Sequence, residues 1–194
     1  LFQIWLNLPK ASKMVEPHFA MLWNEKIPLY KHEDENGKTT EVKVIAGKIG
    51  DTMAPAPAPN SWAANPDNEV AIWTIKMAPG ASWKLPVASK EANRTLYFYK
   101  GNDLKVASTD VALHHSAQLL ADQETIIENG NQEAYMLILQ GKPLNEKVVQ
   151  YGPFVMNSEQ EINEAYREFQ KTQFGGWPWP SSDHVHPRDK QRFA

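Results

Sequence analysis

Two parts of different character meet in this sequence at the stretch Gly141-Lys142-Pro143-Leu144-Asn145-Glu146-Lys147-Val148-Val149-Gln150-Tyr151-Gly152-Pro153-Phe154-Val155-Met156-Asn157. Before it lie many short segments in which apolar and polar residues alternate, and after it Ser158 opens a helical pattern. The stretch is too particular in composition to be a generic joint between a strand and a helix. It is therefore the place from which the rest of the chain is best interpreted.

The part before this stretch predicts an antiparallel β-structure. Its short alternating runs are separated by turn residues such as Asn36-Gly37, Pro79-Gly80 and Asn129-Gly130. Short strands at close spacing with such turns are typical of a sandwich or barrel. Strands are expected at residues 2–8, 27–30, 41–50, 70–77, 83–87, 94–99, 104–107, 111–115, 118–120, 124–129 and 133–140.

One segment inside this part cannot belong to a sheet. Ala54-Pro55-Ala56-Pro57-Ala58-Pro59 carries three prolines, and each lacks the backbone N–H that a ladder of hydrogen bonds needs. An extended surface loop of polyproline character is expected here, and a ligand for proline-recognition domains is the alternative.

A helix is predicted after the opening stretch. Ser158 and Glu161 have the spacing of a capping box, in which a serine caps the helix and an acidic residue follows three positions later. The apolar residues that follow share one helix face: Ile162, Ala165, Tyr166 and Phe169. Gly175-Gly176 is expected to end the helix. The tail beyond it carries Trp177 and Trp179, and we expect another surface to cover them.

The opening stretch strongly resembles the signature near the end of pirin-family proteins, which consist of two cupin barrels. The segment Gln3-Ile4-Trp5-Leu6-Asn7-Leu8-Pro9-Lys10 resembles the part of pirins that leads out of the first barrel. The resemblance extends to 42–47, 114–128 and 174–194. It implies a mainly β fold, with a cupin-type antiparallel β-barrel or jelly roll at 1–150. A C-terminal helix and a Trp/Pro-rich tail follow at 151–194.

The same resemblance implies that the N-terminal metal-binding barrel of the family is absent from this chain. The first residue is Leu1 and a strand-like pattern begins at once, so the chain is expected to be a fragment of a longer protein. The 17-residue loop at 52–68 departs from the family pattern, since it is longer and richer in Pro and Ala than the resemblance predicts.

Composition narrows the classes of function. The net charge is −3 and the sequence pI is about 6.1, which argues against a nucleic-acid-binding surface. The chain has no cysteine, so disulfides, thiolate nucleophiles and cysteine-based zinc sites are excluded. The absence of cysteine fits a cytoplasmic protein. No apolar run approaches the roughly 20 residues of a membrane span.

The expected barrel lacks the metal ligands of a catalytic cupin. Such a barrel holds a divalent metal with His and Glu side chains on facing strands. The first cupin motif, started at Gly80, places its two histidines at Pro86 and Ala88, and its glutamate falls on Arg94. The second motif places its histidine near Ile126. We therefore predict no catalytic, cofactor-binding or metal-binding residue in this chain.

The histidines offer no other site. The pair His114-His115 is expected in or beside a strand, with the rings on opposite faces, one packed and one solvated. His184 and His186 have the spacing of metal ligands but lie in a Pro-rich tail, where no rigid element would orient them. His18 and His32 are isolated and expected to be exposed.

The resemblance implies that the whole protein is a metal-dependent, quercetin 2,3-dioxygenase-like oxygenase. Its iron, or another divalent metal, would lie in the first barrel, and this fragment alone would have no catalysis. Its docking face is expected to be apolar and to associate with the missing barrel or another protein chain. The alternative is a non-catalytic protein-binding module that co-regulates transcription or metabolism. A third hypothesis is a small-molecule pocket inside the barrel. No direct nucleic-acid or membrane partner is expected.

Overall fold

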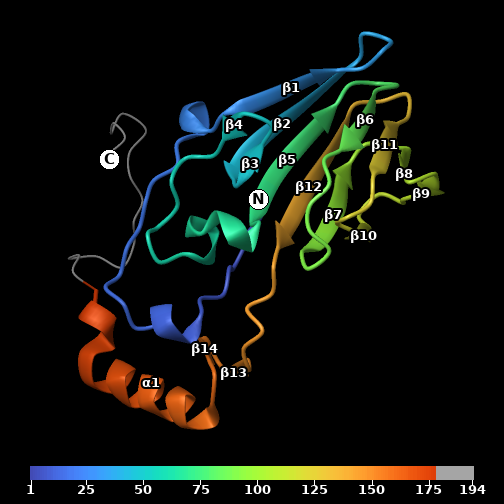
Figure 1. The fold of residues 1–194 in the computed structure, drawn as a ribbon. Helices are drawn as coiled ribbons and strands as arrows, with labels where there is room; N and C mark the ends of the chain where they lie inside the picture. The colour runs from blue at the N-terminus through green and yellow to red at the C-terminus, as the bar shows by residue number, and fades with distance from the viewer. Residues whose placement is uncertain (178–194) are drawn as a thin grey trace. The chain divides into compact units, whose positions relative to one another are not determined.

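Alternating apolar residues between positions 29 and 141 build two antiparallel sheets around one core (Figure 1). The structure is a computed structural model, and it describes residues 1–177. It forms two compact units. The barrel unit contains Leu1–Leu8 and Val15–Leu144, and the helical unit contains Pro9–Met14 and the chain from Asn145 onward. Within residues 1–177, no helix combines the length and apolar character that crossing a membrane requires.

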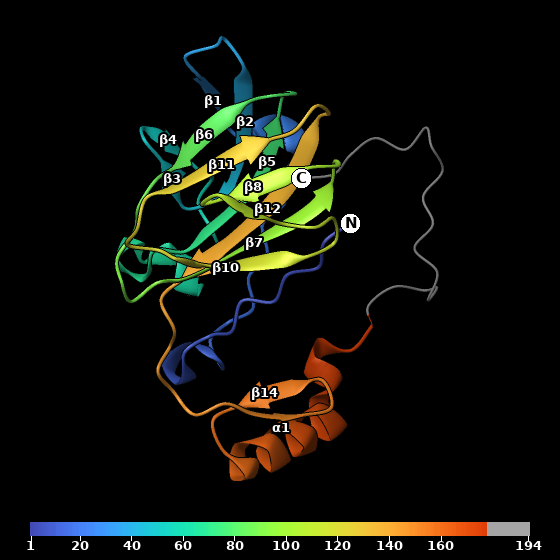
Figure 2. The same ribbon diagram turned by 90° about the vertical axis from the view of Figure 1, so that its right-hand side faces the viewer.

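The larger sheet of the barrel unit has six strands in the order β1-β2-β5-β12-β7-β10, and the smaller has four in the order β6-β11-β8-β9. In Figure 2 the smaller sheet lies over the larger one. The larger sheet contains β1 (Leu29–Glu33), β2 (Thr39–Ala46), β5 (Ala71–Met77), β12 (Ala134–Gly141), β7 (Asn93–Lys100) and β10 (Ser116–Leu120). The smaller contains β6 (Ser82–Leu85), β11 (Thr125–Asn129), β8 (Leu104–Val106) and β9 (Thr109–Asp110).

Alternation along the strands decides which side chains enter the core. Along β5, Trp73 and Ile75 are at most 3 % exposed, while the residues between them are only half-buried. The same period on β7 turns Arg94, Leu96 and Phe98 inward. Successive strand residues point to opposite faces, so one face of each strand supplies the core and places Arg94 in it.

Two strand predictions were wrong. Residues 111–115 form a turn between β9 and β10, in which His114 has a φ of 65° and a bend replaces extended backbone. Residues 2–8 are not in a strand, because no described strand pairs with them. Instead the Phe2 ring packs edge-on against Tyr99 with its centroid 4.9 Å away.

The proline-rich segment is a loop, as predicted, apart from two short pieces before it. These pieces, β3 (Lys48–Ile49) and β4 (Thr52–Met53), pair with each other. After the prolines the chain forms two single turns of 3₁₀-helix, η3 (Trp62–Ala64) and η4 (Pro66–Asn68). Each turn is capped by a side chain, since Ser61 accepts from Ala63 N and Asn65 accepts from Asp67 N.

In the helical unit, a hairpin of β13 (Val149–Tyr151) and β14 (Phe154–Met156) precedes α1 (Glu159–Thr172). The apolar face of α1 is confirmed: Ile162 and Ala165 are buried, and the Tyr166 ring lies 4.7 Å from that of Phe154. The helix ends at Thr172, earlier than predicted, because Gln173 already adopts left-handed backbone. The other short helices are η1 (Lys10–Ser12), η2 (Asn24–Lys26) and η5 (Gln173–Gly175).

Candidate functional site

The barrel interior shows what stands where a catalytic cupin carries its metal ligands. Arg94 on β7 points inward and is 1 % exposed. Pro86 and Ala88 lie beyond the end of β6, in the loop that leads to β7. Ile126 is 49 % exposed on the outer face of β11, whereas Thr125 beside it is buried. The inward residue at this end of β11 is Thr125. The position that the second motif assigns to its histidine therefore does not face the barrel interior.

These residues do not fit a divalent metal. A guanidinium is a permanent cation and only donates hydrogen bonds, so Arg94 repels a metal ion where a cupin needs a carboxylate. The side chains of Pro86, Ala88 and Ile126 are hydrocarbons and have no lone pair with which to bind a metal ion. Within residues 1–177, no group of three His, Cys, Asp or Glu side chains could hold a metal ion. We derive no reaction step through a metal in this barrel.

Arg94 instead takes part in a series of linked hydrogen bonds. Arg94 lies directly opposite Gln140 on the neighbouring strand β12. Its Nε donates to Gln140 Oε1 at 2.7 Å, and Gln140 Nε2 in turn donates to the backbone oxygen of Glu69 at 2.9 Å. The amide of Gln140 therefore fixes the plane of the guanidinium and ties it to the segment that precedes β5.

A second set of contacts closes this end of the barrel. The Glu69 carboxylate accepts from Ser89 N at 3.3 Å and also from Ser89 Oγ, and it lies 3.7 Å from Lys142 Nζ. Ala88 N donates to Ala121 O at 2.7 Å, which joins the β6–β7 loop to the β10–β11 loop. Glu69 itself has a φ of 50°, a costly conformation for a residue with a Cβ. This backbone position is held by contacts on both sides of the residue.

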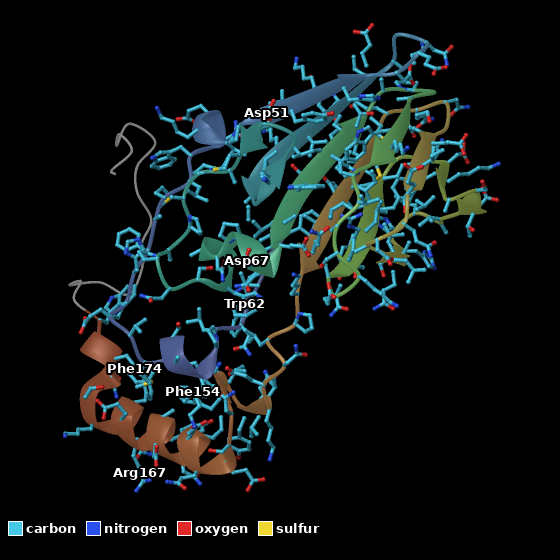
Figure 3. The ribbon with its side chains drawn as sticks, in the orientation of Figure 1. Asp51, Trp62, Asp67, Phe154, Arg167 and Phe174 are labelled. Atoms are coloured by element: carbon cyan, nitrogen blue, oxygen red, sulfur yellow. The ribbon has the colours of Figure 1, made fainter. Side chains whose placement is uncertain are left out.

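The loop at 61–69 is fastened to the end of β12. Trp62 Nε1 donates to Lys142 O at 2.8 Å, and Lys142 N donates to Asn68 O at 2.8 Å. Asn68 Nδ2 donates back to Trp62 O at 2.8 Å. Figure 3 labels Trp62 and Asp67 in this loop. The loop whose length departs from the family pattern thus forms part of the barrel wall beside Glu69.

Arg94 keeps its positive charge in this environment. Burial lowers the pKa of the Arg94 guanidinium, and the negative charge of Glu69 acts in the opposite direction. Arginine does not lose its proton in proteins. The barrel interior therefore holds a full positive charge beside apolar residues such as Leu96.

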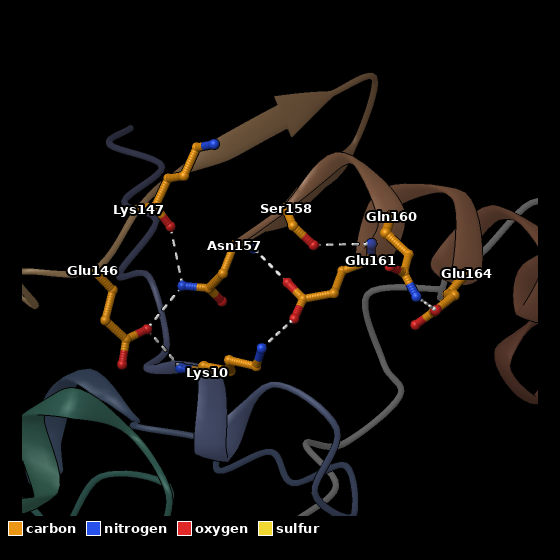
Figure 4. Close-up of polar contacts among 8 residues, drawn as sticks. All are labelled: Lys10, Glu146, Lys147, Asn157, Ser158, Gln160, Glu161 and Glu164. Atoms are coloured by element: carbon orange, nitrogen blue, oxygen red, sulfur yellow. Dashed lines mark hydrogen bonds and ion pairs between the residues drawn. The ribbon is translucent and has the colours of Figure 1, made fainter.

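Beyond Leu144, the polar residues of the stretch at 141–157 serve the helical unit (Figure 4). Lys10 Nζ lies 2.6 Å from Glu161 Oε1, and Lys10 N donates to Glu146 Oε2 at 2.8 Å. Asn157 Nδ2 donates to the same Glu146 oxygen at 2.9 Å, while Asn157 N donates to Glu161 Oε2 at 2.8 Å. Ser158 Oγ accepts from Glu161 N at 3.2 Å, which confirms the capping box. The network ties residues 9–14 to the start of α1.

Beside this network lies a groove of about 310 Å³. Its lining combines two lysines, three glutamates and three small or apolar residues: Lys10, Lys13, Met14, Met156, Glu161, Glu164, Ala165 and Glu168. Burial lowers the pKa of Lys13, opposed by Glu146 and Glu161. Lysine and glutamate charges largely offset each other here, so the groove favours no ligand of particular charge. In Figure 3, Phe154 and Phe174 lie on one side of α1 and Arg167 on the other.

The histidines form no site in the described part of the chain. His114 and His115 lie directly before β10, as predicted, but both are exposed, so the prediction of one packed ring was wrong, because the left-handed backbone of His114 replaces the alternation of a strand. His18 is exposed as expected, and His32 is half-buried on β1. His184 and His186 lie outside the described residues, as does Trp179. Trp177 is 58 % exposed.

Comparison with known proteins identifies the family to which this fold belongs. The family model of the pirin C-terminal cupin domain matches residues 72–175, which is more than half of the chain. The chain belongs to the pirin family. The match covers the strands from β5 to β12 that enclose Arg94, and it continues through the hairpin and α1. The mainly β, cupin-type fold that the resemblance implied is thereby confirmed.

Individual pirin relatives agree. The chain is 30 % identical over 174 residues to a Pseudomonas aeruginosa protein named "Putative quercetin 2,3-dioxygenase", covering 90 % of this chain and 56 % of the relative. It is 30 % identical over 178 residues to human "Pirin", covering 89 % and 56 %. The structure of a quercetin 2,3-dioxygenase from Acinetobacter baumannii superposes with a TM-score of 0.72 at 29 % identity, covering 87 % and 55 %. The chain thus spans just over half the length of these pirin-family relatives.

Sequence reasoning missed the partners of Arg94 in this pirin-family barrel. It identified Arg94 as a residue unable to bind metal, but neither Gln140 nor Glu69 was singled out. One signal was available, since Arg94 and Gln140 both occupy inward positions of strands whose other buried inward residues are apolar. A polar residue on the buried face of a strand requires a partner.

Proposed function

We propose that this chain is the C-terminal barrel of a pirin-type protein whose complete form is a metal-dependent, quercetin 2,3-dioxygenase-like oxygenase. The chain alone has no oxygenase activity. The observation that carries the proposal is the buried guanidinium of Arg94, which stands where a catalytic cupin needs a carboxylate. The names of the Pseudomonas and Acinetobacter relatives support the oxygenase class for the complete protein. Iron or another divalent metal would belong to the other barrel.

The role of this chain is then to present a docking surface. In the barrel unit, large apolar side chains of residues 1–8 and 15–22 are exposed. Phe2 is 44 % exposed, Trp5 70 %, Phe19 81 % and Met21 48 %. Large exposed apolar side chains of this kind mark an interaction site where they gather on one surface. We propose the N-terminal metal-binding barrel of the same protein as the partner that covers them.

Oxygen uptake by the purified chain tests the lack of catalysis. Quercetin is supplied with ferrous iron under air, and a full-length pirin-family quercetinase serves as the positive control. The expected result is oxygen consumption no faster than that of quercetin and iron without protein. Turnover by the chain above this background would overturn the proposal.

The same exposed apolar residues favour a second candidate function, a non-catalytic protein-binding module. The two candidates differ in what binds to the surface. A separately purified N-terminal barrel from a full-length relative is titrated into the chain in a calorimeter, and the binding curve is compared with that of a Trp5→Ser variant. Saturable binding that Trp5→Ser weakens supports the barrel partner. Absence of binding favours a different protein partner.

A further inference from the structure

Among the buried side chains of residues 1–177, Arg94 alone carries a full charge. The other buried polar side chains are neutral: Thr40, Asn68, Thr125 and Asn129. A buried charge is normally paired with an opposite charge, because transfer out of water is costly. The buried cation of Arg94 is therefore expected to have an opposite charge beside it.

The guanidinium has no negatively charged partner in the described chain. Its Nε is bonded to Gln140, which is a neutral amide. No carboxylate of residues 1–177 forms a salt bridge with it, and the nearby Glu69 carboxylate is engaged by Ser89 and Lys142. The Arg94 Nη1 atom is buried and has no hydrogen-bond partner. This buried donor group of a permanent cation thus has no acceptor among the described residues.

We propose that this end of the barrel binds a small monovalent anion, a carboxylate such as formate or a halide, through Nη1 of Arg94. An anionic acceptor would complete the hydrogen bonding of Nη1 and offset the charge in a single contact, which is the strongest kind of hydrogen bond available to a guanidinium. The bond from Gln140 holds the guanidinium plane in advance of binding. The anion must be small because the guanidinium is enclosed: Arg94 and Leu96, its neighbour on the inward face of β7, are at most 1 % exposed.

The site would reverse the charge preference of a catalytic cupin. Where a metal-binding barrel collects carboxylates and imidazoles around a cation, this barrel places a cation and would collect an anion. The loops that close the end of the barrel would control entry. Glu69 holds Ser89 of the β6–β7 loop, so release of that contact is the simplest way in. The inference does not depend on whether the complete protein is an oxygenase.

Thermal unfolding of the purified chain tests the site. Sodium formate is titrated at constant ionic strength in a halide-free sulfonate buffer, with sodium gluconate as the balancing salt because gluconate is a carboxylate too large for the interior. We expect saturable stabilisation by formate, with the folding constant about elevenfold higher at ten times the dissociation constant. A parallel chloride titration separates a halide from a carboxylate as the natural ligand.

Two variants locate the effect. Arg94→Met keeps an unbranched apolar stem and should lose the response to formate. Arg167→Met, on the exposed surface of α1, should keep it. Equal stabilisation of Arg94→Met and the wild type, or no response of the wild type to formate or chloride beyond that to gluconate, would overturn the proposal.

A second measurement on the wild type covers the case in which Arg94→Met does not fold. In a ¹⁵N-labelled sample, the side-chain Nε–H of Arg94 is protected by its bond to Gln140 and gives a separate signal. That signal should shift saturably with formate and stay unchanged with gluconate. A signal that does not respond to formate or chloride would refute the anion site.

Discussion

Replacing Asn129 by alanine should destabilise the barrel unit more than any change at its surface. Asn129 ends β11 and is 8 % exposed. Its Nδ2 donates to Gln132 O at 2.7 Å, to Ala78 O at 2.8 Å and, less favourably, to Met77 O at 3.2 Å. One side chain therefore joins the turn after β5 to the turn before β12.

The size of the loss follows from these bonds. An amide nitrogen has two hydrogens, so the two short bonds carry most of the energy. Each contributes roughly 0.5–1.5 kcal/mol net, and a carbonyl left buried without a donor costs about 1–3 kcal/mol more. These contributions add to about 2–6 kcal/mol, and removal of the buried Oδ1 of Asn129, which has no partner, offsets part of them, so we expect Asn129→Ala to lower the free energy of unfolding by about 2–4 kcal/mol. At roughly 2–4 °C per kcal/mol, this corresponds to a fall in Tm of about 4–16 °C.

Urea unfolding followed by tryptophan fluorescence measures the change. Trp73 and Trp83 are 3 % and 2 % exposed in the barrel core, so their emission reports on this unit. Asn102→Ala, in an exposed turn, is the matched control and should change stability by less than about 0.5 kcal/mol. A loss at Asn129 as small as that of the control would refute the reasoning.

Asn129→Asp keeps the shape of the side chain but removes its hydrogen-bond donor. An ionised carboxylate has no hydrogen to donate and faces carbonyl oxygens, so at neutral pH it should destabilise at least as much as alanine. Burial against those oxygens raises the pKa of the new carboxyl in the folded state. The folded protein then binds the proton more tightly than the unfolded chain, and the deficit shrinks as the pH falls. A deficit independent of pH would contradict this account.

Three predictions concern the helical unit, and hydrogen exchange of the α1 amides measures each. Ser158→Ala removes the helix cap and should cost about 1 kcal/mol, whereas Ser158→Asp should restore protection. Gly152→Ala should lower stability by at least about 1–2 kcal/mol, because Gly152 has a φ of +56°. The new Cβ would also meet Tyr166 Oη at 2.5 Å, so Tyr166→Phe should recover part of the loss. The hydrogen bond from Lys10 is the largest cause that lowers the pKa of Glu161 in the folded state. The contribution of Glu161 to stability is therefore present above its ordinary pKa of 4.5 and is lost as the pH falls through the lower folded value. Glu161→Gln should abolish this loss, and an unchanged pH dependence would show that another group causes it.

The two functional proposals make separate demands on the barrel. A docking role requires the exposed apolar residues near the start of the chain, whereas an anion site requires only the interior end around Arg94. Trp5→Ser should therefore leave the response to formate intact, and Arg94→Met should leave binding of the N-terminal barrel intact. Loss of both properties in either variant would indicate that the fold, rather than a site, was changed.

Much of the fold could be predicted from local sequence. Strand alternation placed β2, β5, β7, β11 and β12 to within a few residues, because burial of one strand face leaves a period of two in the sequence. The cap at Ser158 and the apolar face of α1 followed from short-range spacing too, because a capping box joins residues three positions apart and a helix face repeats every three to four. Segments with few local signals failed. The turn at 111–115 looks apolar enough for a strand, yet the positive φ of His114 bends the chain.

The sequence by itself determined the family, the β-rich barrel, the capped helix and the lack of metal-ligand residue types at the cupin positions. These features depend on which residues are present and on their spacing along the chain. Only the tertiary structure decided that Arg94 meets Gln140, which is 46 residues away, and that Glu69 holds Ser89. It also decided that Nη1 of Arg94 has no partner in the interior. Such pairings depend on strand register and loop closure, where residues distant in sequence come within hydrogen-bonding distance, and no local pattern encodes them.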